Sequence, residues 1–128
     1  MIDSSDFVDS IQLAVHSPQI RARETCLGLF APHNNEKKTT IIVEYPELYE
    51  RSIKEHIRPT KILPRIERFT KWLLDREEVV IAVVGHSSFF REMSGIEADN
   101  CSVWKLALSE EGKWRNAELL LPCPELDS

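Results

Sequence analysis

The sequence lacks the features that mark several large classes of protein. No stretch approaches the roughly 18 consecutive apolar residues of a membrane-spanning helix, and residues 1–10 lack the basic start and apolar core of a secretory signal. The three cysteines form no CxxC pair and no Cys/His spacing typical of a zinc site. No internal repeat is present. These absences argue against a membrane protein, a zinc domain and a repeat array, and we expect reduced thiols and a cytoplasmic location.

The sequence also lacks a strong charge of one sign. Its 128 residues carry a formal net charge of -5, with 29% charged and 42% hydrophobic residues. This balance disfavours disorder, and the negative sign disfavours a nucleic-acid backbone as the main partner. A chain of this length buries about two thirds of its unfolded surface in one core. We therefore expect a single domain over residues 1–128 that binds neither nucleic acid nor membrane.

The strongest pattern that is present is an apolar strand followed by a helix. Six consecutive apolar residues, Val79 to Val84, predict a strand buried on both faces of a sheet. Gly85 would then let the backbone turn, and Ser87 or Ser88 would cap the helix that follows. Backbone amides at such a helix start favour an anion, and a histidine beside them can act on it. His86 is therefore the first candidate for a phosphate-handling site.

A second strand-to-helix transition lies nearer the start of the sequence. Residues Ile11 to His16 predict a strand, and Ser17-Pro18 predicts the cap and first position of a helix that runs to about Phe30. The buried face of this helix is expected to hold Ala22, Cys26, Leu29 and Phe30. Arg21 lies near the start of the helix, so this transition also has a basic residue beside it.

The remaining chain predicts a short strand, an irregular segment, a helix and a hairpin. Thr39 to Val43 is the strand, and residues 44–58 show no clear period, which is typical of a lid or wall over a site. From Thr60 a helical period returns with four apolar residues: Ile62, Ile66, Phe69 and Leu73. Cys101 to Leu108 and Trp114 to Leu121 predict the two strands of a hairpin.

A serine esterase is one alternative for the same segment. Residues 85–89, Gly-His-Ser-Ser-Phe, approximate the G-x-S-x-G nucleophile elbow with Ser87 as the nucleophile. Phe89 is bulky where the elbow has glycine. The catalytic histidine of such folds follows the serine, whereas none of the four histidines in this sequence does. The esterase is therefore the weaker interpretation.

Three motifs resemble the signatures of one enzyme family. Residues 17–25 resemble the Ser-Pro-Leu-x-Arg-Ala-x-Gln-Thr signature of the histidine phosphatase superfamily, the phosphoglycerate mutase-like proteins. Residues 48–51, Leu-Tyr-Glu-Arg, are similar to its Leu-x-Glu segment, and residues 86–91 are similar to its second-histidine motif. The resemblance covers roughly residues 11–121. It implies an α/β fold with a mostly parallel sheet flanked by helices, and a site at the carboxyl ends of the strands.

The resemblance also implies roles for individual residues. Arg21 would clamp the phosphoryl oxygens, Glu50 would donate a proton to the leaving alcohol, and His86 would lie beside the phosphoryl group. These roles suit the chemistry, because a guanidinium neutralises phosphoryl oxygens and a carboxylic acid protonates an alkoxide that leaves poorly. Ser87 and Arg51 would contribute to substrate binding. The implied partner is a phosphorylated small molecule or phosphoprotein, and no metal or organic cofactor is implied.

The sequence departs from this family at its defining motif. No Arg-His-Gly triplet occurs, although that motif carries the histidine that becomes phosphorylated. Only 16 residues precede Ser17, too few for the family's first strand and following helix, so we expect a domain truncated at its N-terminus. His16 is interpreted as a residue that ends a strand rather than as a substitute nucleophile.

Three interpretations of this departure stay open. The chain is part of a phosphatase or mutase and is inactive by itself, or it is a pseudo-phosphatase that binds phosphorylated ligands. In the third, it is an unrelated α/β domain in which the motifs are coincidental. Because a phosphohistidine mechanism needs its nucleophile, we expect little or no turnover from residues 1–128 under any of them.

Overall fold

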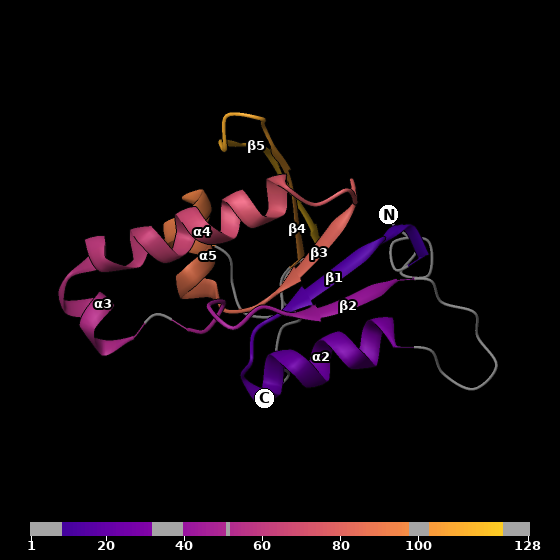
Figure 1. The fold of residues 1–128 in the computed structure, drawn as a ribbon, viewed down its shortest axis with the longest axis horizontal. Helices are drawn as coiled ribbons and strands as arrows, with labels where there is room; N and C mark the ends of the chain where they lie inside the picture. Colours follow the sequence, from indigo (N-terminus) through magenta and orange to yellow (C-terminus); the bar gives the residue numbers. More distant parts are fainter. Residues whose placement is uncertain (1–8, 32–39, 51, 98–102, 122–128) are drawn as a thin grey trace. The chain divides into compact units, whose positions relative to one another are not determined.

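The computed structural model describes residues 9–31, 40–50, 52–97 and 103–121 (Figure 1). The chain forms β1 (Leu13–His16), α2 (Ile20–Phe30), β2 (Ile41–Glu44), α3 (Ile53–Ile57), η1 (Pro59–Ile62), α4 (Leu63–Leu74), β3 (Ile81–Val84), α5 (Ser87–Ser94), β4 (Val103–Leu108) and β5 (Trp114–Leu121). The chain divides into two compact units, the first from Met1–Tyr49 and Arg76–Gly85, and the second from Glu50–Asp75 and His86–Ser128. None of the helices described is long and apolar enough to cross a membrane.

Three parallel strands form the sheet of the first unit, in the order β2-β1-β3 (Figure 1). The central strand, β1, is buried along its whole length. At the carboxyl ends of the strands, His16 lies opposite Glu44 on one side and Val84 on the other. The Ser17 amide extends this pairing by donating to the Val84 carbonyl at 3.0 Å. The expected combination of a parallel sheet and flanking helices is therefore confirmed.

Helix α2 covers one face of this sheet through side chains spaced four residues apart. Ala22, Cys26 and Phe30 are at most 5% exposed. Cys26 and Phe30 form one core cluster with Ile11 and Ala14, which precede and occupy β1. The partly buried side chains packed against this cluster are Ile42, Ala82 and Val84. The helix was predicted from the same spacing, and its end at Phe30 agrees with the sequence.

Two details of α2 differ from the sequence prediction. The helix begins at Ile20 with Gln19 as its N-cap, so Ser17-Pro18 does not start it. The Ser17 hydroxyl instead accepts a hydrogen bond from the Gln19 amide at 3.2 Å, in the extended segment before the helix. Leu29 is 44% exposed rather than part of the buried face, because the spacing of four that buries Phe30 turns the preceding position outward.

The strand that was predicted to be buried on both faces lies at the edge of the described sheet. β3 begins only at Ile81, and its residues are half-buried. Val79 is 86% exposed and Val80 is 41% exposed. The amides of these two valines both donate to the side-chain oxygen of Gln12, at 2.7 and 3.0 Å, so they pair with a side chain instead of a strand. Strand β1, which also has four residues, takes the central place.

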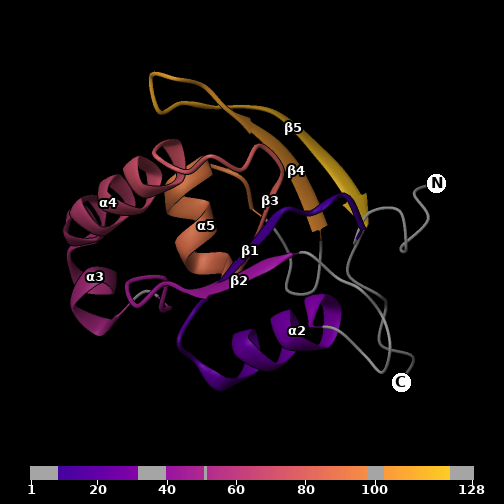
Figure 2. The ribbon, with the colours of Figure 1, turned by 45° about the vertical axis from the view of Figure 1, so that its right-hand side comes forward.

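The helices of the second unit share an apolar core. The side chains predicted from helical spacing are at most 9% exposed: Ile62, Ile66, Phe69 and Leu73. Figure 2 shows α5 beside α4. The ring of Phe69 on α4 meets the ring of Phe89 on α5 edge to face, with 6.0 Å between the ring centroids. Phe89 is completely buried. The predicted helix is confirmed, with its first turn replaced by the short 3-10 helix η1.

The predicted hairpin is confirmed, and one segment that was predicted to be irregular contains a helix. β4 and β5 pair antiparallel. In their turn the Ser109 amide donates to the Lys113 carbonyl at 2.8 Å, and Gly112 adopts a φ of 81°, which favours glycine. Within residues 44–58, α3 forms over Ile53–Ile57. Ile53 and Ile57 of this helix are 80% and 74% exposed, so the two isoleucines form no buried face.

Phe30→Ala tests the packing of α2 on the sheet. Removing a ring that is 1% exposed should lower the free energy of unfolding by about 3–5 kcal/mol. Leu29→Ala is the matched control. The Leu29 side chain is next to Phe30 in the sequence but is 44% exposed, so its removal should lower the free energy of unfolding by under about 1 kcal/mol. Urea denaturation measures both values. Equal stability of the two variants would contradict this packing.

Candidate functional site

His86 lies between the last residues of β3 and the first residue of α5 in the chain. It is the N-cap of α5, its backbone is extended, and its carbonyl accepts a hydrogen bond from the Phe90 amide at 3.1 Å. The N-cap is His86, without a capping hydrogen bond from its side chain, so the expectation that Ser87 or Ser88 is the capping residue is wrong. Ser87 instead is the first helical residue and is half-buried. His86 therefore stands at a helix start, where the first amides lack intrahelical acceptors.

The surroundings of His86 favour a neutral ring. Burial lowers the pKa of His86 from its usual 6.5, the Glu50 carboxylate opposes this by raising the pKa, and the Arg65 guanidinium lowers it further. Since the net pKa is below 6.5, most of the rings are neutral at pH 7 and carry one unprotonated nitrogen. Such a nitrogen can accept a proton or a hydrogen bond, and it can attack an electrophile.

The carboxylates of Glu50 and Glu55 lie near each other in the sequence but have different surroundings. Glu50 is exposed, and its charge acts on His86. Glu55 is 6% exposed and accepts hydrogen bonds from Nε and Nη2 of Arg65 at 3.0 and 2.6 Å. The hydrogen bond from Arg65 is the main cause that lowers the pKa of Glu55. Of the two, Glu50 suits a proton donor, and Glu55 is committed to an ion pair.

Arg21 belongs to the first unit, whereas His86 and Glu50 belong to the second. Arg21 is the second residue of α2, and its side chain is exposed. It therefore occupies the first turn of the helix that follows β1, which is the position expected from the sequence. Within one unit, the structure brings together His86 and Glu50.

His16 is the last residue of β1, as the sequence predicted. Its side chain is 5% exposed, and Nδ1 donates to the Ser17 carbonyl at 2.7 Å. A carbonyl only accepts hydrogen bonds, so the proton lies on Nδ1, and in the neutral ring Nε2 carries the lone pair. A buried ring bonded to its own strand end agrees with a structural role.

The other candidates add no metal site. Arg51, expected to bind substrate, lies outside the described residues, as do His33, Cys101 and Cys123. In the part of the chain that the structure describes, no three His, Cys, Asp or Glu side chains are grouped so that they could hold a metal ion. Cys26 is a free, buried thiol, and burial raises its pKa to about 11, so it is a protonated core residue.

The sequence analysis missed the buried arginine Arg65. It lies beside Ile66 on α4, and its side chain is 3% exposed in an ion pair with Glu55. One signal was available, because Ser52-x-x-Glu55 matches the capping-box pattern that begins a helix. That pattern would have placed Glu55 at the start of α3, but not its pairing with an arginine ten residues later.

The pKa of His86 gives stability a defined dependence on pH. In the unfolded chain this ring binds a proton near pH 6.5, whereas the folded chain binds it only at lower pH. Acidification through this window therefore favours unfolding. In His86→Asn the free energy of unfolding should fall less between about pH 7.5 and 5.5 than in the native chain, as measured by urea denaturation. Identical pH profiles would contradict the lowered pKa.

Glu50→Gln tests the electrostatic link to His86. Because the Glu50 charge raises the pKa of His86, its removal should lower that pKa further in an NMR titration of the imidazole. Glu67→Gln removes an exposed carboxylate from α4 of the same unit and should leave the pKa of His86 unchanged. A pKa of His86 that stays unchanged in Glu50→Gln would show that the carboxylate does not act on this ring.

Comparisons with known proteins add no relative to this description. A scan against models of protein families gave no match. Searches of curated proteins and of solved structures likewise gave none.

Proposed function

We propose that the chain is a histidine-phosphatase-like protein that binds a phosphorylated ligand, with His86 beside the phosphoryl group. One observation carries the proposal: a half-buried histidine at the N-cap of α5 has its pKa lowered by burial and lies within the field of the Glu50 carboxylate. The motif resemblance of residues 17–25, 48–51 and 86–91 supports it. The proposal includes a phosphoglycerate mutase-like fold built on the three-stranded parallel sheet.

The proposed ligand is a phosphate monoester. Its phosphoryl oxygens would accept hydrogen bonds from the first amides of α5, including that of Ser87, since a helix start favours an anion. The motif resemblance, rather than the geometry, assigns to Arg21 the guanidinium that neutralises the remaining charge. The neutral His86 ring would donate through its protonated nitrogen to one phosphoryl oxygen. Glu50 in its protonated form would donate to the ester oxygen.

Binding, rather than turnover, is the activity proposed for these 128 residues. In phosphoryl transfer through phosphohistidine, a histidine nitrogen forms the P–N bond while the ester P–O bond breaks and the leaving oxygen takes a proton. The resemblance assigns that nitrogen to an Arg-His-Gly triplet, which this sequence does not contain. Substrate class, as phosphoglycerate, sugar phosphate or phosphoprotein, is not part of the proposal.

No observation favours the serine esterase. The nucleophile elbow holds its serine in a strained turn, but Ser87 is an ordinary first residue of α5. Its φ is not positive, since Asn116 is the residue with a positive φ among the described residues other than glycine. Ser87 is also followed by no histidine in the sequence.

NMR titration of the ¹⁵N-labelled chain with inorganic phosphate tests the proposal. We expect saturable shifts at the His86 ring and at the first amides of α5. Arg21→Ala and His86→Ala should each weaken binding about ten- to a hundredfold, because each removes a hydrogen bond to a charged group. Arg23→Ala removes an exposed arginine two positions along α2 and should leave the affinity unchanged.

Two results would contradict the proposal. If saturating phosphate leaves the His86 ring and the first turn of α5 unshifted, there is no phosphate site at this helix start. If the native chain hydrolyses p-nitrophenyl phosphate and His86→Ala abolishes the activity, a binding role without turnover is wrong.

A further inference from the structure

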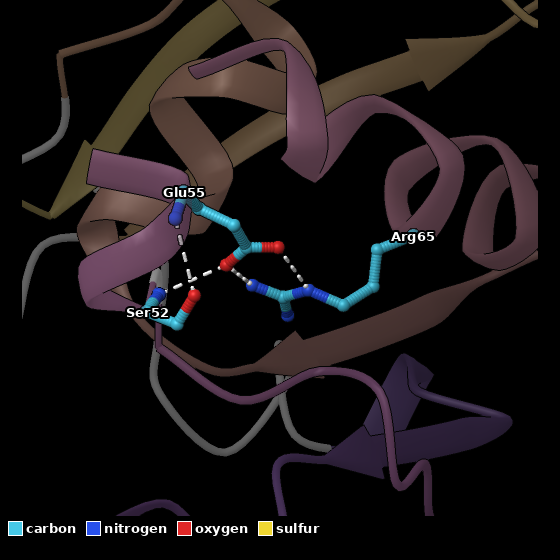
Figure 3. A network of polar contacts seen from close by, with 3 residues as sticks. All are labelled: Ser52, Glu55 and Arg65. Carbon is cyan, nitrogen blue, oxygen red and sulfur yellow. Dashed lines mark hydrogen bonds and ion pairs between the residues drawn. The ribbon is translucent and has the colours of Figure 1, made fainter. Parts of the chain in front are cut away.

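A buried ion pair joins α4 to α3 in the second unit (Figure 3). The Nε of Arg65 donates to Oε2 of Glu55 at 3.0 Å, and its Nη2 donates to Oε1 at 2.6 Å. The side chains of Arg65 and Glu55 are 3% and 8% exposed. Two parallel hydrogen bonds from one guanidinium define its plane, which a single bond would not do.

Ser52 holds the carboxylate end of this pair. Its amide donates to Oε1 of Glu55 at 2.9 Å, and its hydroxyl accepts from the Glu55 amide at 3.2 Å (Figure 3). This reciprocal capping box starts α3, a helix of five residues. Because so short a helix is not stable alone, the cap and the ion pair hold its position. Glu55 is thus fixed from two directions.

The same guanidinium lies over the ring of Phe89, in the first turn of α5. The Cζ atom of Arg65 lies 4.9 Å from the centroid of the Phe89 ring, which is completely buried. Phe89 also meets the rings of Phe69 and Phe90 edge to face. Phe89 is the third residue of α5, and His86 is the N-cap of that helix. A guanidinium held by Glu55 therefore contacts the turn that His86 begins.

Stability alone does not explain why an arginine occupies this buried position. Desolvating two charges is costly, and replacing a buried ion pair with uncharged side chains is often neutral or stabilising. The Arg65 charge does reach His86, where it acts with burial to keep the ring neutral and against the Glu50 carboxylate. Arg65 thus combines a fixed contact to the first turn of α5 with a charge directed at its N-cap.

We propose that Arg65, held in place by Glu55, is a positioning residue that fixes the first turn of α5 and keeps His86 ready to bind a phosphoryl group. The positioning of His86 by Arg65 does not depend on any ligand. Only the statement that His86 is positioned for a phosphoryl group rests on the proposed function. In this role neither Arg65 nor Glu55 touches the ligand. The ion pair acts on the site through the first turn of α5 and through His86.

The first experiment compares the pKa of His86 in two variants by NMR titration of the imidazole. Arg65→Met/Glu55→Gln replaces the pair with uncharged side chains, and the pKa should rise because the positive charge that lowers it is gone. Glu55→Gln keeps the Arg65 charge, so the pKa of His86 should not rise in this variant. A purely structural role would not raise the pKa in the double variant alone. If Glu55→Gln does not fold, the double variant still decides, and an unchanged pKa in it overturns the proposal.

A second ion pair provides the matched control. Arg76 donates to Glu78 through Nε and Nη2 at 2.8 and 3.1 Å, but it lies in the first unit. Arg76→Met/Glu78→Gln should leave the pKa of His86 and the first amides of α5 unchanged. The Arg65→Met/Glu55→Gln variant should shift those amides and weaken phosphate binding about tenfold or more, since small displacements of binding groups are costly.

The outcomes separate this proposal from the proposed function. If the native chain does not bind phosphate but the pKa of His86 responds as expected, the proposed function fails and the positioning of His86 stands. If the native chain binds phosphate but the Arg65→Met/Glu55→Gln variant retains both the native affinity and the native pKa of His86, the positioning role fails and the proposed function stands.

Discussion

The parallel pairing of β1 with β2 and β3 is the constraint on which the first unit depends. Parallel pairs are slightly weaker than antiparallel ones and are normally covered by helices, so strands of four residues need both neighbours and a packed face. Helix α2 supplies that face through Cys26 and Phe30. Because parallel strands end at the same edge, His16 and Val84 face each other where the chain leaves the sheet. The residues that follow either strand therefore begin at this edge of the sheet.

Charged side chains, as well as apolar packing, link the elements of the second unit. Glu55 and Glu50 lie in one acidic stretch, yet a guanidinium and a helix cap bind Glu55, whereas the exposed Glu50 acts on a histidine. This difference matters for the candidate site, because an acid that must release a proton cannot also be held ionised by a buried arginine. The same arginine contacts Phe89. The ion pair and the candidate histidine therefore belong to one electrostatic system.

Part of the fold could be predicted because some signals are local. The spacing of Ile62, Ile66, Phe69 and Leu73 defines one helical face whatever that face packs on, and the hairpin follows from two strand patterns around a turn with glycine. Other features have no local signal. The apolar run from Val79 predicted a central strand, but its period is the same at an edge. The amides of Val79 and Val80 donate to the side chain of Gln12, a residue distant in the sequence, before the strand begins. Helix α3 was not predicted because its five residues are too few to show a helical period.

By itself, the sequence determined the helices and strands other than α3, with different starts for α2 and β3, and it determined the position of His86 at a helix start and the candidate residues Arg21 and Glu50. These depend on the type and spacing of residues that are close together in the sequence. The tertiary structure alone decided that β1 is central, that Glu50 rather than Glu55 acts on the histidine, and that Arg65 is buried. Each of these depends on which distant groups meet, and the free energy of a charge depends on its partners and on its exposure to water, which residue spacing does not specify.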